Sequence, residues 1–319
     1  MATCRSVALK VDVDTHDGMR RGVPVLLEVF RRFSVRATFC LAFGPDNAGK
    51  ALYRVLKDPV FFRKMLRTGA PRLYGWRTIL SGTLLPARPT ASGFPDLVRQ
   101  IRAEKHEVIV HGWDHRLWQD HVAAMDESSI RSQFQQAFCA FEQILGVRPR
   151  AVAAPGWQAT PRSLRVQDKL NLLYASDLRN AEPCFLEAGG HGFRTLQIPT
   201  TGPCVEELLA GGIREEKAIL DALTAPLEAY SFPVLALHAE VEGGPFRGLL
   251  ERLIPLLRNR YERFSTLEEE ARKRLSDGEP IPRRELVFIR LPGRAGRIAS
   301  ASGPPSLVGS GRAGGGRPV

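Results

Sequence analysis

Short apolar runs alternate with amphipathic stretches along most of the chain. Apolar runs of strand length occupy residues 7–13, 37–43, 107–112, 151–154, 174–176, 195–198 and 234–237, with a shorter one near Phe264. Between them, apolar positions recur with the helical period over residues 23–33, 94–105, 127–145, 161–173, 214–228, 246–261 and 267–275. Strands that alternate with helices of this length indicate βαβ units and a parallel sheet. We therefore predict an α/β fold in which about seven parallel strands form a barrel rather than an open sheet.

Two segments depart from this alternation. Residues 47–95 form an insertion between the second strand and the next core helix, and it is too long for an ordinary connection. From about Asp277 onward the chain is rich in Gly, Pro, Ser and Arg. We therefore expect residues 276–319 to be a disordered tail, in which only the apolar stretch 286–291 could dock elsewhere. The prediction is one domain, residues 1–275, with a basic amphipathic insertion and a tail.

The positive charge of the chain is concentrated in those two segments. Of a net charge of +11, residues 47–95 contribute nine Lys or Arg against one acid, and residues 276–319 contribute seven Arg against three acids. Basic residues interleaved with aromatic ones such as Tyr53, Phe61 and Trp76 suit a segment that lies on an anionic membrane surface. A solvated basic lid over a site is the alternative. No nucleic-acid-binding motif accompanies the charge, so we expect no nucleic acid partner.

Cysteine content and hydropathy bear on the compartment. The five cysteines are odd in number, scattered and without a CxxC pair, which argues against a disulfide framework. The first apolar run is interrupted by Lys10 and Asp12, so it does not resemble a signal peptide. No apolar stretch reaches the roughly 18 residues of a membrane-spanning helix. We expect a protein of the cytosol, or one bound peripherally to the cytoplasmic side of the inner membrane.

Ionisable residues follow three of the predicted strands. Asp12 and Asp14 end the first, His111 and His115 follow the third, and His238 follows the strand at 234–237. The carboxyl ends of parallel strands form the functional face of such folds. Two imidazoles four residues apart, with a carboxylate from another strand end, can share one divalent ion. The alternative is that these residues are turn caps, surface coincidences or a satisfied core histidine.

Further short motifs connect these residues into an ordered series. Each motif is weak alone, but together they span roughly residues 5–270 and resemble the series of the NodB-type polysaccharide deacetylases, carbohydrate esterase family 4. The likeness is strongest to the branch that removes an N-formyl group from an amino sugar on undecaprenyl phosphate. It implies a NodB-like distorted (β/α) barrel. The motifs include Asp12-Val-Asp-Thr, Gly22-Val-Pro, Leu73-Tyr-Gly-Trp, His111-Gly-Trp-Asp-His, Gly156-Trp157, Ser176-Asp177-Leu-Arg179 and His238-Ala-Glu-Val-Glu-Gly.

The resemblance implies a role for each strand-end residue. Asp14, His111 and His115 would hold a divalent metal ion, with Asp12 as the general base and His238 as the general acid. An Asp-His-His set accepts zinc, manganese, cobalt or iron, so the sequence does not identify the metal. An ion with three protein ligands keeps an open position for water and substrate.

Two more residues are expected to support the catalytic pair. Asp177 follows the strand at 174–176, and we expect its carboxylate to orient His238. The resemblance also implies an arginine in the third motif that steadies the base carboxylate. The corresponding residues, 153–157, contain no arginine. We expect Arg179 to take that place.

The expected activity is hydrolysis of a linear amide bond (EC 3.5.1). By resemblance, the substrate would be undecaprenyl-phosphate-linked 4-deoxy-4-formamido-L-arabinose, and the products formate and an aminoarabinose lipid for lipid A modification and resistance to cationic peptides. One alternative is N-deacetylation of another glycan or glycolipid. Another is a non-catalytic membrane- or glycan-binding protein of the same fold.

Overall fold

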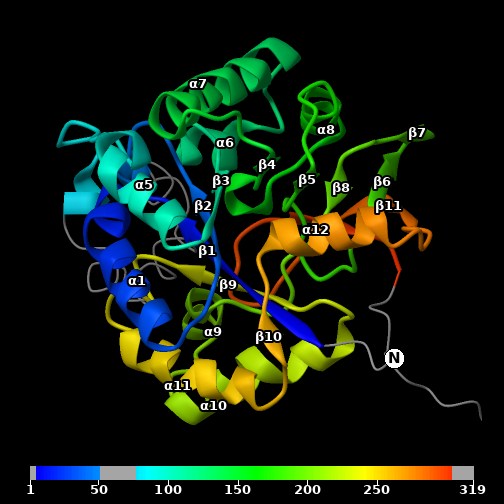
Figure 1. The fold of residues 1–319 in the computed structure, drawn as a ribbon. Coiled ribbons are helices and arrows are strands. Elements are labelled where there is room, and N and C mark those ends of the chain that lie inside the picture. Colours follow the sequence, from blue (N-terminus) through cyan, green and yellow to red (C-terminus); the bar gives the residue numbers. More distant parts are fainter. Residues whose placement is uncertain (1–4, 51–76, 304–319) are drawn as a thin grey trace, which may run out of the picture.

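The structure is a computed structural model that describes residues 5–50 and 77–303. Its centre is a sheet of parallel strands that curls into a barrel (Figure 1). Strand β1 is central: β9 pairs with one of its edges, β10 and β2 pair with successive parts of the other, and β3, β4, β5 and β8 follow β2 in that order. The predicted distorted (β/α) barrel is thereby confirmed. The strand bounds are β1 (Ser6–Val13), β2 (Thr38–Leu41), β3 (Glu107–Val110), β4 (Ala151–Val152), β5 (Tyr174–Ala175), β8 (Leu196–Gln197), β9 (Val234–His238) and β10 (Arg263–Phe264).

The register of β1 decides which residues meet at the carboxyl end of the barrel. Asp12 lies level with Cys40 of β2 on one side and with His238 of β9 on the other. The segment that follows β8 connects β8 to β9: its Thr201 N–H donates to the Val234 carbonyl of β9 at 2.8 Å. The strand ends of β1 and β9 are therefore adjacent, although more than 200 residues separate them in sequence.

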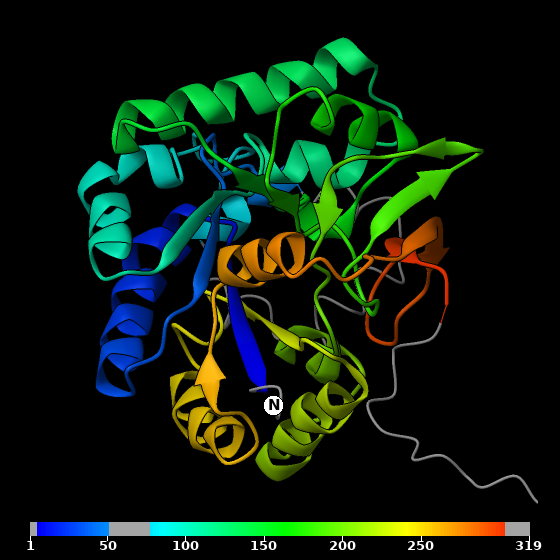
Figure 2. The ribbon, with the colours of Figure 1, turned by 45° about the vertical axis from the view of Figure 1, so that its right-hand side comes forward.

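Helices cover the outside of the barrel (Figures 1 and 2). In the longest helix, α7, the Asp126 side chain caps the amino-terminal end by accepting from the Ser129 N–H. Gly146, with a φ of 66°, caps the carboxyl-terminal end. Helix α12 (orange in Figure 2) begins at the amino-terminal ends of β2 and β3, where its Leu267 N–H donates to the Thr38 hydroxyl at 2.9 Å. The helix bounds are α1 (Val23–Arg32), α5 (Pro95–Ala103), α6 (His115–His121), α7 (Glu127–Leu145), α8 (Pro161–Gln167), α9 (Val205–Ala210), α10 (Glu216–Thr224), α11 (Arg247–Arg258) and α12 (Leu267–Ser276).

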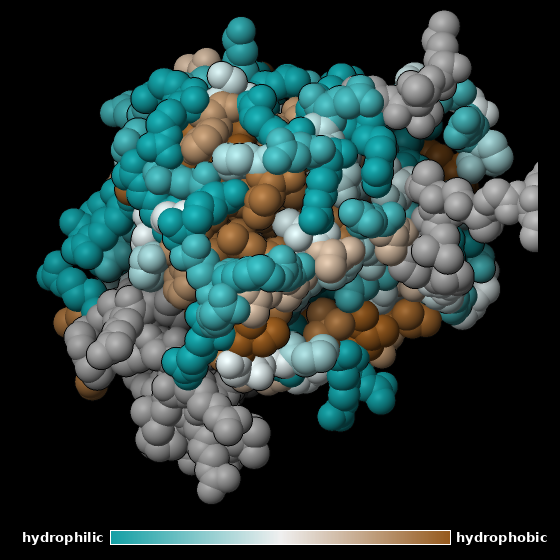
Figure 3. Space-filling view, turned by 90° about the horizontal axis from the view of Figure 1, so that it is seen from below, coloured by the Kyte–Doolittle hydropathy of each residue, from teal (hydrophilic) through white to brown (hydrophobic). Residues whose placement is uncertain are grey.

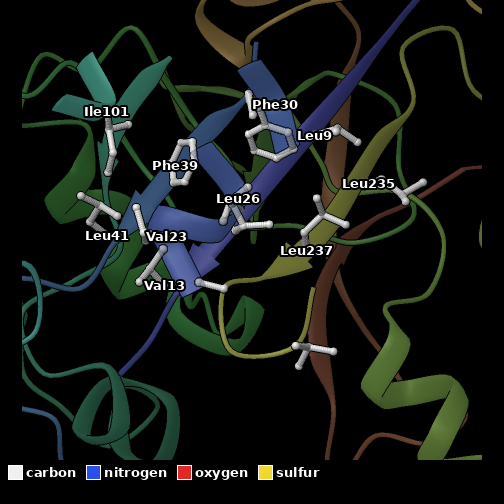
Figure 4. Packing of buried hydrophobic residues seen from close by; sticks show 14 of the residues in the cluster. Leu9, Val13, Val23, Leu26, Phe30, Phe39, Leu41, Ile101, Leu235 and Leu237 are labelled. Carbon is white, nitrogen blue, oxygen red and sulfur yellow. The ribbon is translucent and has the colours of Figure 1, made fainter. Parts of the chain in front are cut away.

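The two faces of β1 have different surroundings. Leu9 and Val13 belong to the large apolar cluster between the strands and the outer helices, where they lie with Leu26 and Phe30 of α1 (Figure 4). The residues that alternate with them point into the barrel, because side chains along a strand alternate between faces. There, Ala8 packs in a smaller apolar cluster with residues of the other strands. Both faces of β1 are thus buried, which explains why its apolar residues do not alternate with exposed polar ones.

The prediction of a disordered tail over residues 276–319 is wrong for most of its described part. Strands β11 (Arg283–Ile289) and β12 (Ile298–Ala301) pair antiparallel, and β11 also pairs parallel with β6 (Phe185–Ala188), which in turn pairs with β7 (His191–Gly192). Strand β11 therefore has a partner on each edge, and one of them, β6, comes from a distant part of the chain. Residues 304–319 lie outside the described part of the chain.

Other expectations about local structure were partly met. Helix α8 ends at Gln167, earlier than the predicted 161–173, and the helices α6 and α9 were not predicted. Most of the 47–95 insertion, residues 51–76, lies outside the described part, so its predicted amphipathic character stays a prediction.

No helix among the described residues is long and apolar enough to cross a membrane. Polar side chains cover much of the face seen from below, with apolar patches between them (Figure 3).

A buried hydrogen-bond network closes the amino-terminal end of the barrel. The Glu107 carboxyl at the start of β3 accepts from the Tyr174 hydroxyl at 2.7 Å, from the Thr38 hydroxyl at 2.7 Å and from the Glu268 N–H at 3.0 Å. It thereby ties β2, β3 and β5 to the first turn of α12. Burial nevertheless raises the pKa of Glu107 to about 7.

This pKa predicts a specific pH dependence of stability. Because the pKa of Glu107 rises from 4.5 to about 7 on folding, its stabilising contribution is complete below about pH 4.5 and is lost as the pH rises through 7. We expect Glu107→Gln to remove about 2 kcal/mol of the decline between pH 5 and 8. Urea unfolding across that range measures it, with exposed Glu262→Gln as the control. Equal pH dependence in wild type and Glu107→Gln would contradict the prediction.

The loop between β11 and β12 offers a test of how tightly the C-terminal segment packs. Gly293 and Gly296 both have a positive φ, 73° and 79°, so alanine costs about 1 kcal/mol of backbone strain at either position. A Cβ on Gly293 would lie 2.0 Å from the Glu207 carbonyl oxygen of α9, whereas one on Gly296 would meet nothing within 4 Å. We expect Gly293→Ala to lower the free energy of unfolding by about 2–4 kcal/mol and Gly296→Ala by about 1 kcal/mol. Equal losses would mean that the loop does not pack on α9.

Candidate active site

Asp14, His111 and His115 form a set of three possible metal ligands at the carboxyl end of the barrel. One ligand atom from each lies within 4.8 Å of the others. The His111 Nε2 is 3.4 Å from the Asp14 Oδ1, and the His115 Nε2 is 3.3 Å from the Asp14 Oδ2. Asp14 follows β1, His111 follows β3, and His115 opens α6. The structure therefore brings these predicted ligands together from two strand ends.

The protonation of this set suits a cation. The His111 Nδ1 is 2.9 Å from the Ala153 carbonyl, which can accept only from a protonated Nδ1, so the lone pair of His111 lies on the Nε2 that faces Asp14. Burial would raise the pKa of Asp14, but the adjacent imidazoles hold it well below its usual range. Burial lowers the pKa of His115 to about 4, which keeps it neutral. The Asp14 Oδ1 has no hydrogen-bond donor and is buried. An ionised carboxylate, two imidazoles and an orphaned oxygen fit a divalent metal ion.

Glu240 holds the turn that presents Asp14. Its Oε1 accepts from the Thr15 N–H at 2.9 Å, from the Thr15 hydroxyl at 2.6 Å and from the Asp14 N–H at 3.3 Å. Burial, and then the charge of Asp14, raise the pKa of Glu240 to about 8. A segment after β9 thus fixes the backbone at the end of β1.

Asp12 is a buried carboxylate beside this set, and it is paired with Lys10. The Lys10 Nζ donates to both carboxylate oxygens, at 2.6 and 2.8 Å, and the side chains of both residues are almost fully buried. The two residues are two apart in β1 and therefore share the inner face of the barrel. Burial opposes ionisation of Asp12, but the ammonium of Lys10 outweighs it and lowers the pKa of that carboxyl. Asp12 is consequently an ionised proton acceptor next to the metal ligands.

His238, at the end of β9, is held by two glutamates. Its Nδ1 is 3.0 Å from the Glu206 Oε1, and its backbone N–H donates to the Glu242 Oε2 at 2.7 Å. Burial would lower the pKa of His238, but the carboxylate of Glu206 raises it well above its usual range. His238 therefore carries a proton near neutral pH, as a general acid must before it acts.

Two predicted supporting contacts are corrected by the structure. Asp177 accepts from Gln167 Nε2 at 2.8 Å and from Gln197 Nε2 at 3.3 Å, and the carboxylate paired with His238 is that of Glu206. The sequence could not show this, because Glu206 is brought to β9 by the loop after β8.

Arg179 likewise does not take the predicted place beside the base. Its guanidinium donates to both oxygens of Glu207, at 3.1 and 2.9 Å, whereas Asp12 is bound by Lys10. A signal for Lys10 was present in the sequence. A lysine inside an otherwise apolar buried strand, two residues before a carboxylate, must share its face and pair with it.

Trp157, in a short turn after β4, connects these groups. Three cations lie over its ring: Arg179 at 4.3 Å, Arg294 at 4.6 Å and Lys10 at 5.1 Å from the centroid. The centroid of its ring lies 6.3 Å from that of the His238 ring, and the two ring planes are inclined at 79°. Arg294, from the loop before β12, also donates to the Gly156 carbonyl at 2.9 Å and to the Glu207 Oε1 at 3.2 Å. The C-terminal segment thus reaches the surroundings of the site.

The arrangement supplies both proton transfers that amide hydrolysis needs. An ionised carboxylate and a protonated imidazole flank the candidate metal ligands, with Asp12 and His238 level on adjacent strands. The carboxylate can accept a proton from water, and the imidazole can give one to a departing amine. Comparison with known proteins agrees with this chemistry.

The sequence pattern of the family described as polysaccharide deacetylase matches residues 2–175. A protein of Shewanella sediminis (strain HAW-EB3) that bears the name 4-deoxy-4-formamido-L-arabinose-phosphoundecaprenol deformylase ArnD is 32% identical over 92% of this chain and 93% of its own length. A protein of Wigglesworthia glossinidia brevipalpis with the same name is 28% identical over 88% of this chain and 97% of its own.

Solved structures show the same fold at lower identity. A structure described as a polysaccharide deacetylase from Mycobacterium smegmatis has a TM-score of 0.61 at 20% identity, covering 91% of this chain and 97% of that one. PuuE allantoinase has a TM-score of 0.59 at 16% identity, covering 88% and 94%. The predicted resemblance is confirmed: this chain belongs to the polysaccharide deacetylase family and is a hydrolase of linear amide bonds.

Proposed function

We propose that this enzyme removes the N-formyl group of undecaprenyl-phosphate-linked 4-deoxy-4-formamido-L-arabinose. The products are formate and the free aminoarabinose lipid, which serves lipid A modification. The observation that carries the proposal is the convergence of Asp12, Asp14, His111, His115 and His238 at one end of the barrel. The names and near-complete coverage of the curated relatives point to this substrate.

Asp14, His111 and His115 would hold the metal ion, with zinc, manganese and cobalt as candidates. When bound, such an ion polarises the substrate carbonyl and makes water more acidic. Asp12 takes a proton from the attacking water as the new bond to the formyl carbon forms. His238 gives its proton to the amide nitrogen as the carbon–nitrogen bond breaks, because an amine leaves readily only once protonated. Afterwards the proton on Asp12 returns to solvent, and His238 is protonated again beside Glu206.

The proposed site of action is the cytoplasmic surface of the inner membrane. The insertion 47–95 would contact the anionic surface, since its basic residues attract acidic lipids. Its described portion includes Leu84, which is 80% exposed, and Leu85, which is 38% exposed. Two adjacent exposed leucines suit shallow insertion between lipid chains.

The proposed activity is tested by formate release. We expect the purified protein to release formate from the formamido-sugar lipid, and a chelator to abolish the release until a divalent metal is returned. Asp14→Asn should lose activity, because it weakens the proposed metal site. Acetate release from the acetamido analogue at a comparable rate would contradict the formyl assignment and favour N-deacetylation of a related glycan.

The pairing of His238 with Glu206 rather than Asp177 predicts how two matched variants differ. Glu206→Gln and Asp177→Asn each replace a carboxylate by an amide of the same shape. We expect Glu206→Gln to lower kcat about 10–100-fold and to move the alkaline limb of the pH–rate profile to lower pH, because the carboxylate that raises the pKa of His238 is gone. Asp177→Asn should leave that limb in place, since its hydrogen-bond partners are Gln167 and Gln197. A shifted limb in Asp177→Asn alone would reverse the assignment.

A further inference from the structure

The described residues contain a second set of possible metal ligands, and His238 belongs to it. One ligand atom each from Cys204, Glu206 and His238 lies within 4.8 Å of the others, and this set shares no residue with Asp14, His111 and His115. The Nδ1 of His238 is the ring atom that faces Glu206, at 3.0 Å. That separation is close to the one between two ligand atoms of a tetrahedral zinc site.

The thiol of this set is buried and held in place. Cys204 is 2% exposed and caps α9: its sulfur accepts from the Glu207 N–H, while its own N–H donates to the Glu207 Oε2 at 3.2 Å. A serine, threonine, aspartate or asparagine is the usual residue at such a position. The sulfur therefore has a fixed position beside the imidazole and the carboxylate.

An additional carboxylate borders the set. Glu242 is 1% exposed and its Oε2 accepts from the His238 N–H, but its Oε1 has no hydrogen-bond partner. A buried carboxyl oxygen without a hydrogen-bond partner, beside a thiol, a carboxylate and an imidazole, is costly, and a cation bound there would satisfy it.

We propose that Cys204, Glu206 and His238 form a second divalent-cation site, selective for zinc. Sulfur, nitrogen and oxygen donors together match the tetrahedral coordination of zinc, and a thiolate ligand disfavours manganese and magnesium. The Asp-His-His set contains no sulfur, so the two sites differ in preference as well as in position.

Occupation of the second site has a consequence for the reaction, which rests on the proposed function. A zinc ion on the Nδ1 of His238 replaces the proton there and separates the ring from Glu206. The imidazole is then no longer an imidazolium that can give up a proton near neutral pH. Zinc above one equivalent is therefore an inhibitor, and its effect is on the order of a hundredfold, the usual contribution of a general acid.

Cobalt reports the site without reference to activity. We expect the second equivalent of Co²⁺ added to the metal-free, full-length protein to give a near-ultraviolet thiolate-to-cobalt charge-transfer band. Cys204→Ser should lose this band and bind one equivalent less, and it should still fold, because serine is a good helix cap. The exposed Cys139→Ser is the matched control and should keep the band. A band that persists in Cys204→Ser, or is absent from the wild type, overturns the proposal.

Zinc titration of the enzyme loaded with one equivalent of metal then separates the two proposals. Formate release by the wild type should fall with the second equivalent, whereas Cys204→Ser should keep its basal activity and resist inhibition. His111→Ala should retain the cobalt–thiolate band although its first site is impaired. If the band appears but zinc does not inhibit, the second site stands and the role of His238 as general acid fails.

Discussion

The buried ion pair of Lys10 and Asp12 is the constraint on which the rest of the site depends. Removing two charges from water costs several kcal/mol for each, and only close pairing offsets this. Here the ammonium reaches both carboxylate oxygens and also faces the Trp157 ring. Alternation along β1 puts Lys10 and Asp12 on the inner face of the barrel. The chain that follows Asp12 then places Asp14 in the set of candidate metal ligands. The pair therefore fixes the base, its charge and its distance from the candidate metal ligands at once.

The five central residues of the site could be predicted from the sequence for a simple reason. Each of Asp12, Asp14, His111 and His238 lies at or next to the carboxyl end of a buried apolar strand, and His115 follows within four residues. Parallel strands bring such ends to one edge, whatever the details of packing. The fold followed from the same local information, since period-two and period-3.6 patterns alternate over most of the chain.

The partners of these residues were not predictable, because they depend on how loops return to the barrel. Glu206 lies eight residues after the Ile198 strand end, in a stretch with no periodicity that would aim it at His238. Strand β11 contains a short apolar run, but the Gly-, Pro- and Arg-rich sequence around it indicates disorder until the pairing with β6 is known. Arg179 was assigned to the wrong carboxylate for the same reason. Several acids are within reach of a buried arginine, and only the tertiary structure shows that Glu207 is the one that binds it.

The residues proposed for the two proton transfers come from different halves of the chain. The match to the family pattern ends at residue 175, so it includes Asp12, Asp14, His111 and His115 but not His238, Glu206 or Arg294. In the proposed mechanism the first half thus holds the candidate metal ligands and the base, and the second half holds the proton donor and its carboxylate partner. The second half also contains the C-terminal loop whose Arg294 lies over the Trp157 ring. Any amide substrate therefore needs both halves, because attack by water and protonation of the leaving amine are separate steps, and the residues proposed for them come from strands at opposite ends of the sequence.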